Sequence, residues 1–207
     1  MVSELLTAAD RERIEAAIRD AEKKSSLEFV VAVVARSADY WQWRVLLAVC
    51  TGLSAAFALL QWGPRLPGSL VILLQIPAGA LAYLALGIGP LHRLLIPSPT
   101  SAKTVQAHAF RLFAEHGLHQ TRDHTGLLIL VSALERRVTI LGDAGLHARV
   151  GSAGWQQHVE HLVARLRENR AADGIVEVIQ RIDAALGSDF PARSDDIDEL
   201  PNAVIQS

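Results

Sequence analysis

The stretch TGLLILVSALERRVTILGD, residues 125–143, consists of two short apolar runs joined by a charged turn. The runs GLLILVS and RVTILG are rich in leucine, isoleucine and valine and have the length of ordinary strands. Only the residues ALER separate them, and a connection this short joins antiparallel neighbours. The stretch therefore predicts a β-hairpin, which belongs in a water-soluble module.

Helices and one further strand are predicted on both sides of this β-hairpin. Thr7 and Asp10 have the spacing of a capping box at the start of a helix. The run LEFVVAVVA, residues 27–35, is rich in β-branched residues and apolar apart from Glu28, as in a strand covered on both faces. Further amphipathic helices are predicted at residues 103–117, 154–170 and 172–186. This order of elements predicts an α/β fold with a small mixed β-sheet sandwiched by helices.

Two uncharged apolar runs, residues 45–60 and 66–89, lie between the first strand and the β-hairpin. A helix needs roughly 17 to 25 apolar residues to cross a bilayer, and the first run reaches this length with its flanking tryptophans, which favour the headgroup level. The runs therefore predict a two-helix transmembrane hairpin. A buried helix pair in a soluble core and a shallow re-entrant pair in one leaflet are the alternatives. The residues assigned to the spans include Val45, Leu60, Leu70 and Ile88.

The chain accordingly divides into four segments. Residues 1–37 form the first helix and strand of the soluble module, residues 43–89 form the transmembrane hairpin, and residues 98–190 form the remainder of the module. Residues 191–207 are acidic and punctuated by proline, so we expect them to be disordered. The first residues lack the apolar core of a signal peptide, so we expect internal segments to enter the membrane.

Charge and cysteine usage exclude some classes of site and favour one orientation. The formal net charge is -2 and no stretch interleaves arginines with aromatic residues, so nucleic acid is not an expected partner. Cys50 is the single cysteine, which excludes a disulfide framework and a cysteine-based zinc site. One basic residue lies in the loop between the apolar runs, whereas the outer flanks carry Arg36, Arg44, Arg93 and Lys103. The positive-inside rule then predicts that the soluble module is cytoplasmic.

Three stretches outside the apolar runs carry a family resemblance. They are LEFVVAVVARS, FRLFAEHGLHQTRDHTGLLILVSALERRVTILGDAGLHARV and AADGIVEVIQRIDAALGSDFP, with Gly117, Gly126, Gly142, Gly145 and the ERRV turn as their most specific positions. They resemble the TPM domain family, specifically its bacterial membrane-bound branch, although SSLEFVV and GDAGLHARV depart from the family pattern. The resemblance implies a TPM-like α/β/α sandwich in a bacterial inner membrane. The family includes a thylakoid-lumen protein linked to photosystem II repair and an animal auxiliary subunit of an acetylcholine receptor, and weak phosphatase activity and calcium binding have been attributed to some members.

Sheet topology predicts which residues face the membrane. If the strands at 27–35 and 126–132 are parallel, their carboxyl ends share the edge from which the apolar hairpin departs. The charged turn, with Glu135, lies at the same edge. We expect a basic surface there that binds anionic headgroups, and an ordinary solvated turn is the alternative. The residues of this predicted membrane surface are Arg36, Arg44, Arg93, Arg136 and Arg137.

The opposite edge of the sheet is the place where carboxylates and imidazoles are expected to converge. Glu28, Asp123 and Asp143 offer oxygen ligands to a hard cation such as Ca²⁺. A transition metal would instead suit His124 and His147 together with Asp143. The alternative is a group of solvated turn residues, with Asp143 making a local turn bond beside Gly142. His158 and His161 also share one helix face, which we expect to be solvated.

No motif announces a catalytic nucleophile. The chain lacks G-x-S-x-G, a phosphate loop of the G-x-x-x-x-G-K type and H-E-x-x-H. The first hypothesis is therefore a membrane-tethered binding or accessory module that acts on another membrane protein or on envelope assembly. The alternative is a weak metal-dependent phosphatase that uses the loops around Asp123 and Asp143. Small residues in the first apolar run also make a homo-oligomer through the hairpin a candidate.

Overall fold

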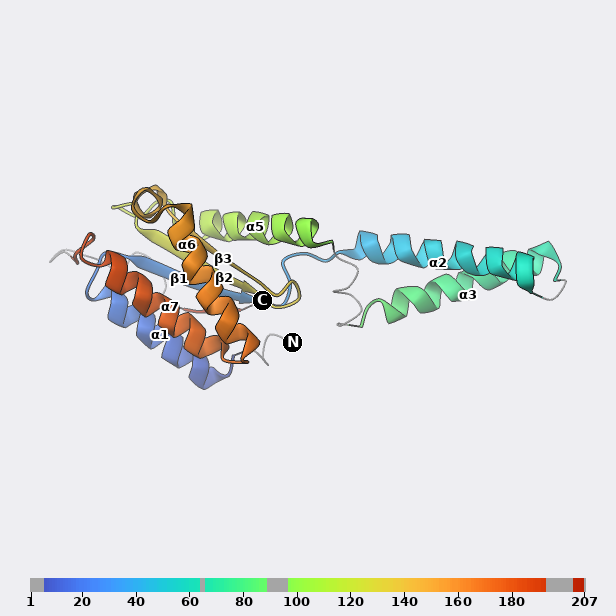
Figure 1. Ribbon diagram of the computed structural model, residues 1–207, viewed down its shortest axis with the longest axis horizontal. Coiled ribbons are helices and arrows are strands. Elements are labelled where there is room, and N and C mark those ends of the chain that lie inside the picture. Colours follow the sequence, from blue (N-terminus) through green and yellow to red (C-terminus); the bar gives the residue numbers. More distant parts are fainter. Residues whose placement is uncertain (1–5, 64–65, 89–96, 193–202, 207) are drawn as a thin grey trace. The chain divides into compact units, whose positions relative to one another are not determined.

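The computed structural model describes residues 6–63, 66–88, 97–192 and 203–206. The chain forms two compact units, one made of Met1–Ser37 with Ala102–Ser207 and the other of Ala38–Ser101. We call the first the sheet unit and the second the hairpin unit (Figure 1).

The sheet unit contains a four-stranded mixed sheet with the strand order β3-β2-β1-β4. β1 pairs in parallel with β2, and β2 pairs in antiparallel with β3, so the predicted β-hairpin and the predicted mixed sheet are confirmed. The elements of this unit are α1 (Ala8–Glu22), β1 (Glu28–Val34), α5 (Ser98–Glu115, whose first residues belong to the hairpin unit), β2 (Gly126–Ser132), β3 (Arg137–Gly142), α6 (Ala144–Arg167), α7 (Ala171–Leu186) and β4 (Ile205–Gln206).

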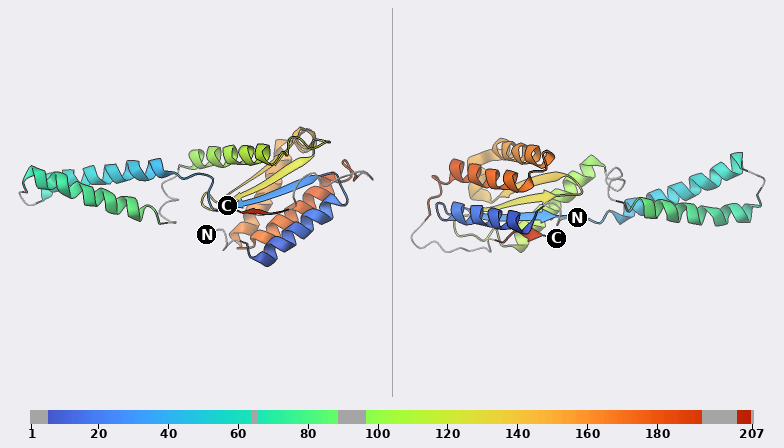
Figure 2. Two further views of the ribbon diagram at one scale, coloured as in Figure 1. Left: turned by 180° about the vertical axis from the view of Figure 1, so that it is seen from behind. Right: turned by 90° about the horizontal axis from the view of Figure 1, so that it is seen from below.

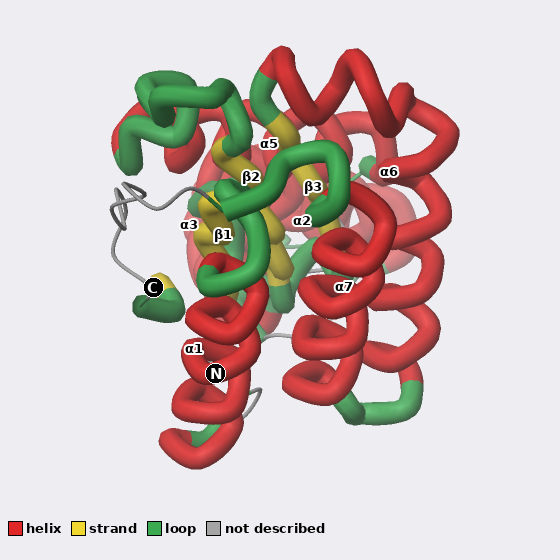
Figure 3. The backbone as a smooth tube through the Cα atoms, turned by 90° about the vertical axis from the view of Figure 1, so that its left-hand side faces the viewer, coloured by secondary structure: helices red, strands yellow, loops and turns green. Residues whose placement is uncertain are grey.

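Helices cover both faces of this sheet (Figure 3). Alternate residues of β1 point to opposite faces, because side chains of a strand alternate. Phe29 packs with α1, α6 and α7 in one apolar core, whereas Val30 packs with α5 in the other. All seven residues of β1 are buried, which explains why its sequence is apolar throughout Phe29–Val34 rather than alternating.

The capping box predicted at the start of α1 is present. The Asp10 N–H donates to Thr7 Oγ1 at 3.1 Å, and the Thr7 N–H donates to Asp10 Oδ2 at 3.0 Å. Both bonds satisfy backbone donors that the first turn of a helix leaves without a partner.

Helix α6 begins at Ala144 rather than at residue 154. Gly151 interrupts it with φ 64° and ψ 172°, values that are not helical and that favour glycine. This kink shifts the apolar face of the segment before it, so the helical period was visible only beyond the kink. The extra turns bury Leu146 completely.

The prediction that residues 191–207 are disordered is wrong at both ends of that segment. Pro191 bridges to Ser25, and Ile205–Gln206 form β4, which pairs in parallel with β1. Val204 and Ile205 contribute apolar side chains to the two cores of the sheet unit, which compensates for ordering this part of the chain. Residues 193–202 lie outside the described residues.

The hairpin unit consists of α2 (Trp41–Trp62) and α3 (Gly68–Ala85), packed against one another. Both helices are long and apolar enough to cross a membrane. Their buried residues are few, namely Ala48, Gly52 and Val71, whereas large apolar side chains face outward along both helices. Among the residues assigned to the spans, Val45, Leu60, Leu70 and Ile88 are all exposed.

Candidate functional site

Strand pairing brings the predicted metal-binding residues to one edge of the sheet, which we call the loop edge. Glu28 lies opposite Gly126 in the β1–β2 register, and Leu127 lies opposite Gly142 in the β2–β3 register. The Asp143 N–H donates to the carbonyl oxygen of Gly126 at 2.9 Å. The start of β1, the start of β2 and the end of β3 therefore share this edge, as the sequence predicted.

Asp143 and His124 form a direct pair at the loop edge. His124 Nδ1 lies 2.9 Å from Asp143 Oδ2, and the other carboxylate oxygen accepts the Ala144 N–H at 2.7 Å as the N-cap of α6. The loop before β2 packs closely against this helix start, because a Cβ atom on Gly145 would lie 2.8 Å from the carbonyl oxygen of His124. Asp143 is therefore held in place by the start of α6 and by the imidazole of His124.

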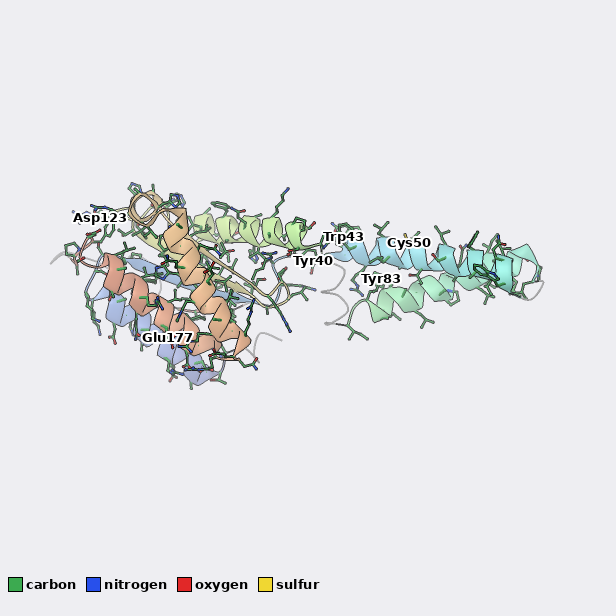
Figure 4. The ribbon with its side chains drawn as sticks, in the orientation of Figure 1. Tyr40, Trp43, Cys50, Tyr83, Asp123 and Glu177 are labelled. Atoms are coloured by element: carbon green, nitrogen blue, oxygen red, sulfur yellow. The ribbon has the colours of Figure 1, made fainter. Side chains whose placement is uncertain are left out.

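The five residues predicted to bind a metal do not assemble into a ligand set. Across the described ranges, no group of three or more histidine, cysteine, aspartate or glutamate side chains is arranged to hold a metal ion. Asp123 lies in the loop before β2 (Figure 4). Asp143 contacts His124 through its side chain and accepts the His147 N–H at its carbonyl oxygen, at 2.9 Å. Sharing an edge fixes where the backbones lie but not where loop side chains point, so the predicted metal site stays a prediction. The geometry consequently gives no support to the phosphatase alternative.

The carboxyl ends of β1 and β2 and the β2–β3 turn form the opposite edge, which we call the turn edge. The Ala133 N–H donates to the carbonyl oxygen of Val34 at 3.0 Å, and the Leu134 N–H donates to that of Ala35 at 2.9 Å. These bonds extend the parallel pairing into the turn, so the chain leaving β1 runs beside the charged turn, as predicted.

A buried carboxylate, which the sequence did not reveal, fastens the turn edge. Glu135 Oε2 accepts the Ser132 hydroxyl at 2.5 Å, and Oε1 accepts the Ser37 N–H at 3.0 Å. The Ser37 and Ser132 hydroxyl oxygens are 2.9 Å apart. Ser132 is completely buried and Glu135 nearly so. Glu135 therefore links the last residue of β2 to the point where the chain leaves the sheet unit.

The predicted basic membrane surface is divided between the two units. Arg36 and Arg136 are exposed at the turn edge, and Arg137 begins β3 there with partial exposure. Arg44 instead belongs to the hairpin unit, where it donates to the carbonyl oxygen of Tyr83 at 2.9 Å and lies 4.2 Å from the centre of that ring. This arrangement combines a hydrogen bond with a cation–π contact between α2 and α3 (Figure 4). Arg93 lies outside the described residues.

Small residues set the close approach of α2 and α3. A Cβ atom on Gly52 would lie 2.9 Å from the carbonyl oxygen of Gln75, and one on Gly79 would lie 3.1 Å from that of Ala48. Backbone contact of this kind needs small residues on both helices, as in helix pairs that pack within a lipid environment.

His161 of α6 packs against α7, so the prediction that it lies on a solvated face is wrong for this residue. His161 Nε2 lies 2.7 Å from Glu177 Oε2, and its Nδ1 lies 3.1 Å from Arg181 Nη1. An arginine can only donate, so Nδ1 of His161 accepts and Nε2 donates to Glu177. His158 is half-buried, and burial, with repulsion from Arg181 and from His161, lowers its pKa below the ordinary value.

The free energy of unfolding of the sheet unit is expected to fall as the pH drops through about 6.5, the ordinary pKa of histidine. Below that pH His158 binds a proton in the unfolded chain but not yet in the folded chain, because its pKa is lowered by folding. The free energy of unfolding therefore keeps falling until the pH reaches the lowered pKa. Thermal unfolding of the full chain in detergent, followed across this range, measures the slope. His158→Gln should flatten it and His119→Gln, at an exposed position, should not; equal slopes for His158→Gln and the wild type would contradict the argument.

Comparison with known proteins identifies the sheet unit. Residues 93–185 match the TPM domain family. The fold is similar to the NMR structure of BA42 protein from the psychrophilic bacterium Bizionia argentinensis, with a TM-score of 0.60, 21% sequence identity and coverage of 98% of this chain and 95% of that chain. No curated protein sequence matches the chain. Residues 93–185 of this chain are thus similar to the TPM domain family, as the sequence resemblance predicted.

Proposed function

We propose that this chain is an integral protein of a bacterial inner membrane, in which α2 and α3 tether a TPM domain that binds another membrane protein or an envelope assembly. The proposal rests on the large apolar side chains that face outward on α2 and α3. These two helices lie in the sequence between β1 and α5. An apolar surface of this extent is typical of contact with lipid or with another protein.

The dimensions of the two helices support a transmembrane hairpin. At 1.5 Å per residue, the 22 residues of α2 span about 33 Å and the 18 residues of α3 about 27 Å, close to the roughly 30 Å of a bilayer core. The alternative of core helices in a soluble protein would require most of their residues to be buried. In the stretches that define the candidate spans, only 11% of the α2 residues and 6% of the α3 residues are buried.

The turn edge supports the proposed orientation of the TPM domain. Only residues 35–40 separate β1 from α2, and six residues reach at most about 20 Å when fully extended. With α2 in the bilayer, this tether would keep Arg36 and Arg136 near the headgroups of the cytoplasmic leaflet, which is anionic. The basic flanks of the hairpin favour the same cytoplasmic side.

Cysteine labelling in intact cells tests the tether and its orientation. In a Cys50→Ser background, a single cysteine is placed either at Pro67, between the helices, or at Ala203, in the sheet unit, where both positions are exposed. An impermeant maleimide should label the Pro67→Cys chain in intact cells and the Ala203→Cys chain only after permeabilisation. The reverse pattern would place the domain outside and overturn the orientation. Release of the full chain from membranes by alkaline carbonate would overturn the tether itself.

A further inference from the structure

A groove about 380 Å³ in volume runs along one side of the hairpin unit, between α2 and α3. The two helices, teal and green in Figure 2, lie beside one another in both of its views. Val49 and Gly52 line the groove from α2, and Ile76, Gly79 and Ala80 line it from α3. Because glycine and alanine have small side chains, another helix can approach closely there.

Gln75 lines the same groove near the middle of both helices. It lies close to the centre of α3, and its backbone oxygen is next to Gly52, close to the centre of α2. The side chain is half-buried, and within the described part of the chain its amide has no hydrogen-bond partner. In a bilayer no water reaches this depth, so such an amide is unfavourable until another group donates and accepts hydrogen bonds. The groove therefore fits a neighbour that brings a polar group to the centre of the bilayer.

A second copy of this chain brings that group to the required depth. Copies inserted in the same direction have Gln75 at one level of the bilayer, so a two-fold axis along the membrane normal sets the two side chains opposite one another. An amide both donates and accepts, so each Gln75 can donate to the side-chain oxygen of the other. Lipid chains offer no hydrogen bond, and an unrelated helix offers one only if it carries a polar residue at this level.

We propose that the groove between α2 and α3 is a self-association surface, through which two copies of this chain form a dimer joined by a pair of hydrogen bonds between their Gln75 amides. Exposed apolar side chains beside the groove, such as Val49 and Ile76, fill the hollow of the opposite copy. The inference rests on the proposed insertion of α2 and α3 in a membrane and adds a role for them beyond tethering. A dimer presents two sheet units together, which raises the avidity for a partner that offers two sites.

Energy transfer between full-length chains in vesicles of phosphatidylcholine and phosphatidylglycerol tests the dimer. In a Cys50→Ser background, Ala203→Cys at an exposed position carries either a donor or an acceptor dye. Titration of the protein-to-lipid ratio then gives the dissociation constant. Gln75→Leu should raise this constant about fivefold or more, because leucine has a similar size but makes no hydrogen bond. Gln61→Leu is the matched control, since it makes the same change at an exposed position of α2 outside the groove, and it should leave the constant unchanged.

A second pair of variants tests the groove without altering its amide. Ala80 is exposed and lines the groove, so Ala80→Phe should occupy the hollow and abolish energy transfer. Ala85→Phe, at an exposed position of α3 that does not line the groove, should retain energy transfer. This pair decides the question if Gln75→Leu fails to insert or fold.

The proposal is overturned if the wild type is monomeric in these vesicles, or if Gln75→Leu associates as tightly as Gln61→Leu. Equal association of Ala80→Phe and Ala85→Phe would overturn it as well, because the copies would then meet through another surface. Extraction with alkaline carbonate separates this inference from the proposed tether. A chain that stays in the membrane but is monomeric contradicts the dimer alone, whereas a chain released from the membrane contradicts both.

Discussion

Gly126→Ala should destabilise the sheet unit by about 3 kcal/mol or more, which is at the upper end of single substitutions. A Cβ atom at this position would overlap the carbonyl oxygen of Leu118. That oxygen is backbone and cannot rotate away as a flexible side chain would. Leu118 is itself completely buried, its N–H is bound to the carbonyl oxygen of Phe113, and the preceding Gly117 has φ 68°. Relief of the overlap would therefore require α5 and β2 to separate.

Denaturant unfolding of the full chain in detergent measures this loss. Gly68→Ala is the matched control, because open space surrounds Gly68 and its φ lies outside the positive range that disfavours a side chain. The control should cost about 1 kcal/mol or less. If Gly126→Ala were no more destabilising than this control, the backbone between α5 and β2 would have to shift at little cost in free energy. Such a result would contradict the argument that this contact is rigid.

Glu135→Ala should lower the free energy of unfolding by about 2 to 3 kcal/mol, because it leaves the Ser132 hydroxyl and the Ser37 N–H without their carboxylate acceptor. The hydroxyl of Ser132 is in a fully buried residue, so water does not replace the lost acceptor there. Glu135→Gln should cost less, since the amide keeps one acceptor oxygen. Chemical denaturation of the three proteins under one detergent condition gives the comparison.

A double-mutant cycle shows whether the loss comes from this hydrogen bond. Ser132→Ala removes the donor, so adding Glu135→Ala to it should cost clearly less than the sum of the two single losses. Arg136→Asn, at an exposed neighbouring position with φ 49°, should change stability little. Additive losses in the cycle would mean that Glu135 stabilises the turn edge by other contacts.

The backbone architecture could be predicted because it follows from patterns that are local in the sequence. The apolar runs, the ALER turn and the capping box at Thr7 each specify an element, and the rule for parallel crossovers then assigns residues to the two edges of the sheet. The same patterns identified the two apolar helices. These features depend on periodicity and turn length, which a single sequence displays directly.

The side-chain contacts could not be predicted, because they join positions far apart in the chain. Ser37 and Ser132 are 95 residues apart, and neither is unusual in its local sequence. The contact between His161 and Glu177 could not be predicted for the same reason, since Glu177 lies on a different helix. Among the described residues no cluster of metal ligands is found, and the contacts of Asp143 with the start of α6 and with His124 were likewise not evident from the sequence. β4 was missed because the acidic composition around it outweighed the short apolar sequence Ala203–Ile205.

The position of the hairpin unit has a consequence for biosynthesis. A ribosome completes β1 before α2 and α3, and it completes β2 only afterwards. The strand that pairs with β1 along its whole length is thus absent while the apolar helices are being synthesised, and β1 is an aggregation-prone segment during that interval. Contacts across so long an intervening loop also raise the contact order, so closure of the sheet should be slow and late. Completion of the sheet unit must therefore follow the synthesis of both apolar helices.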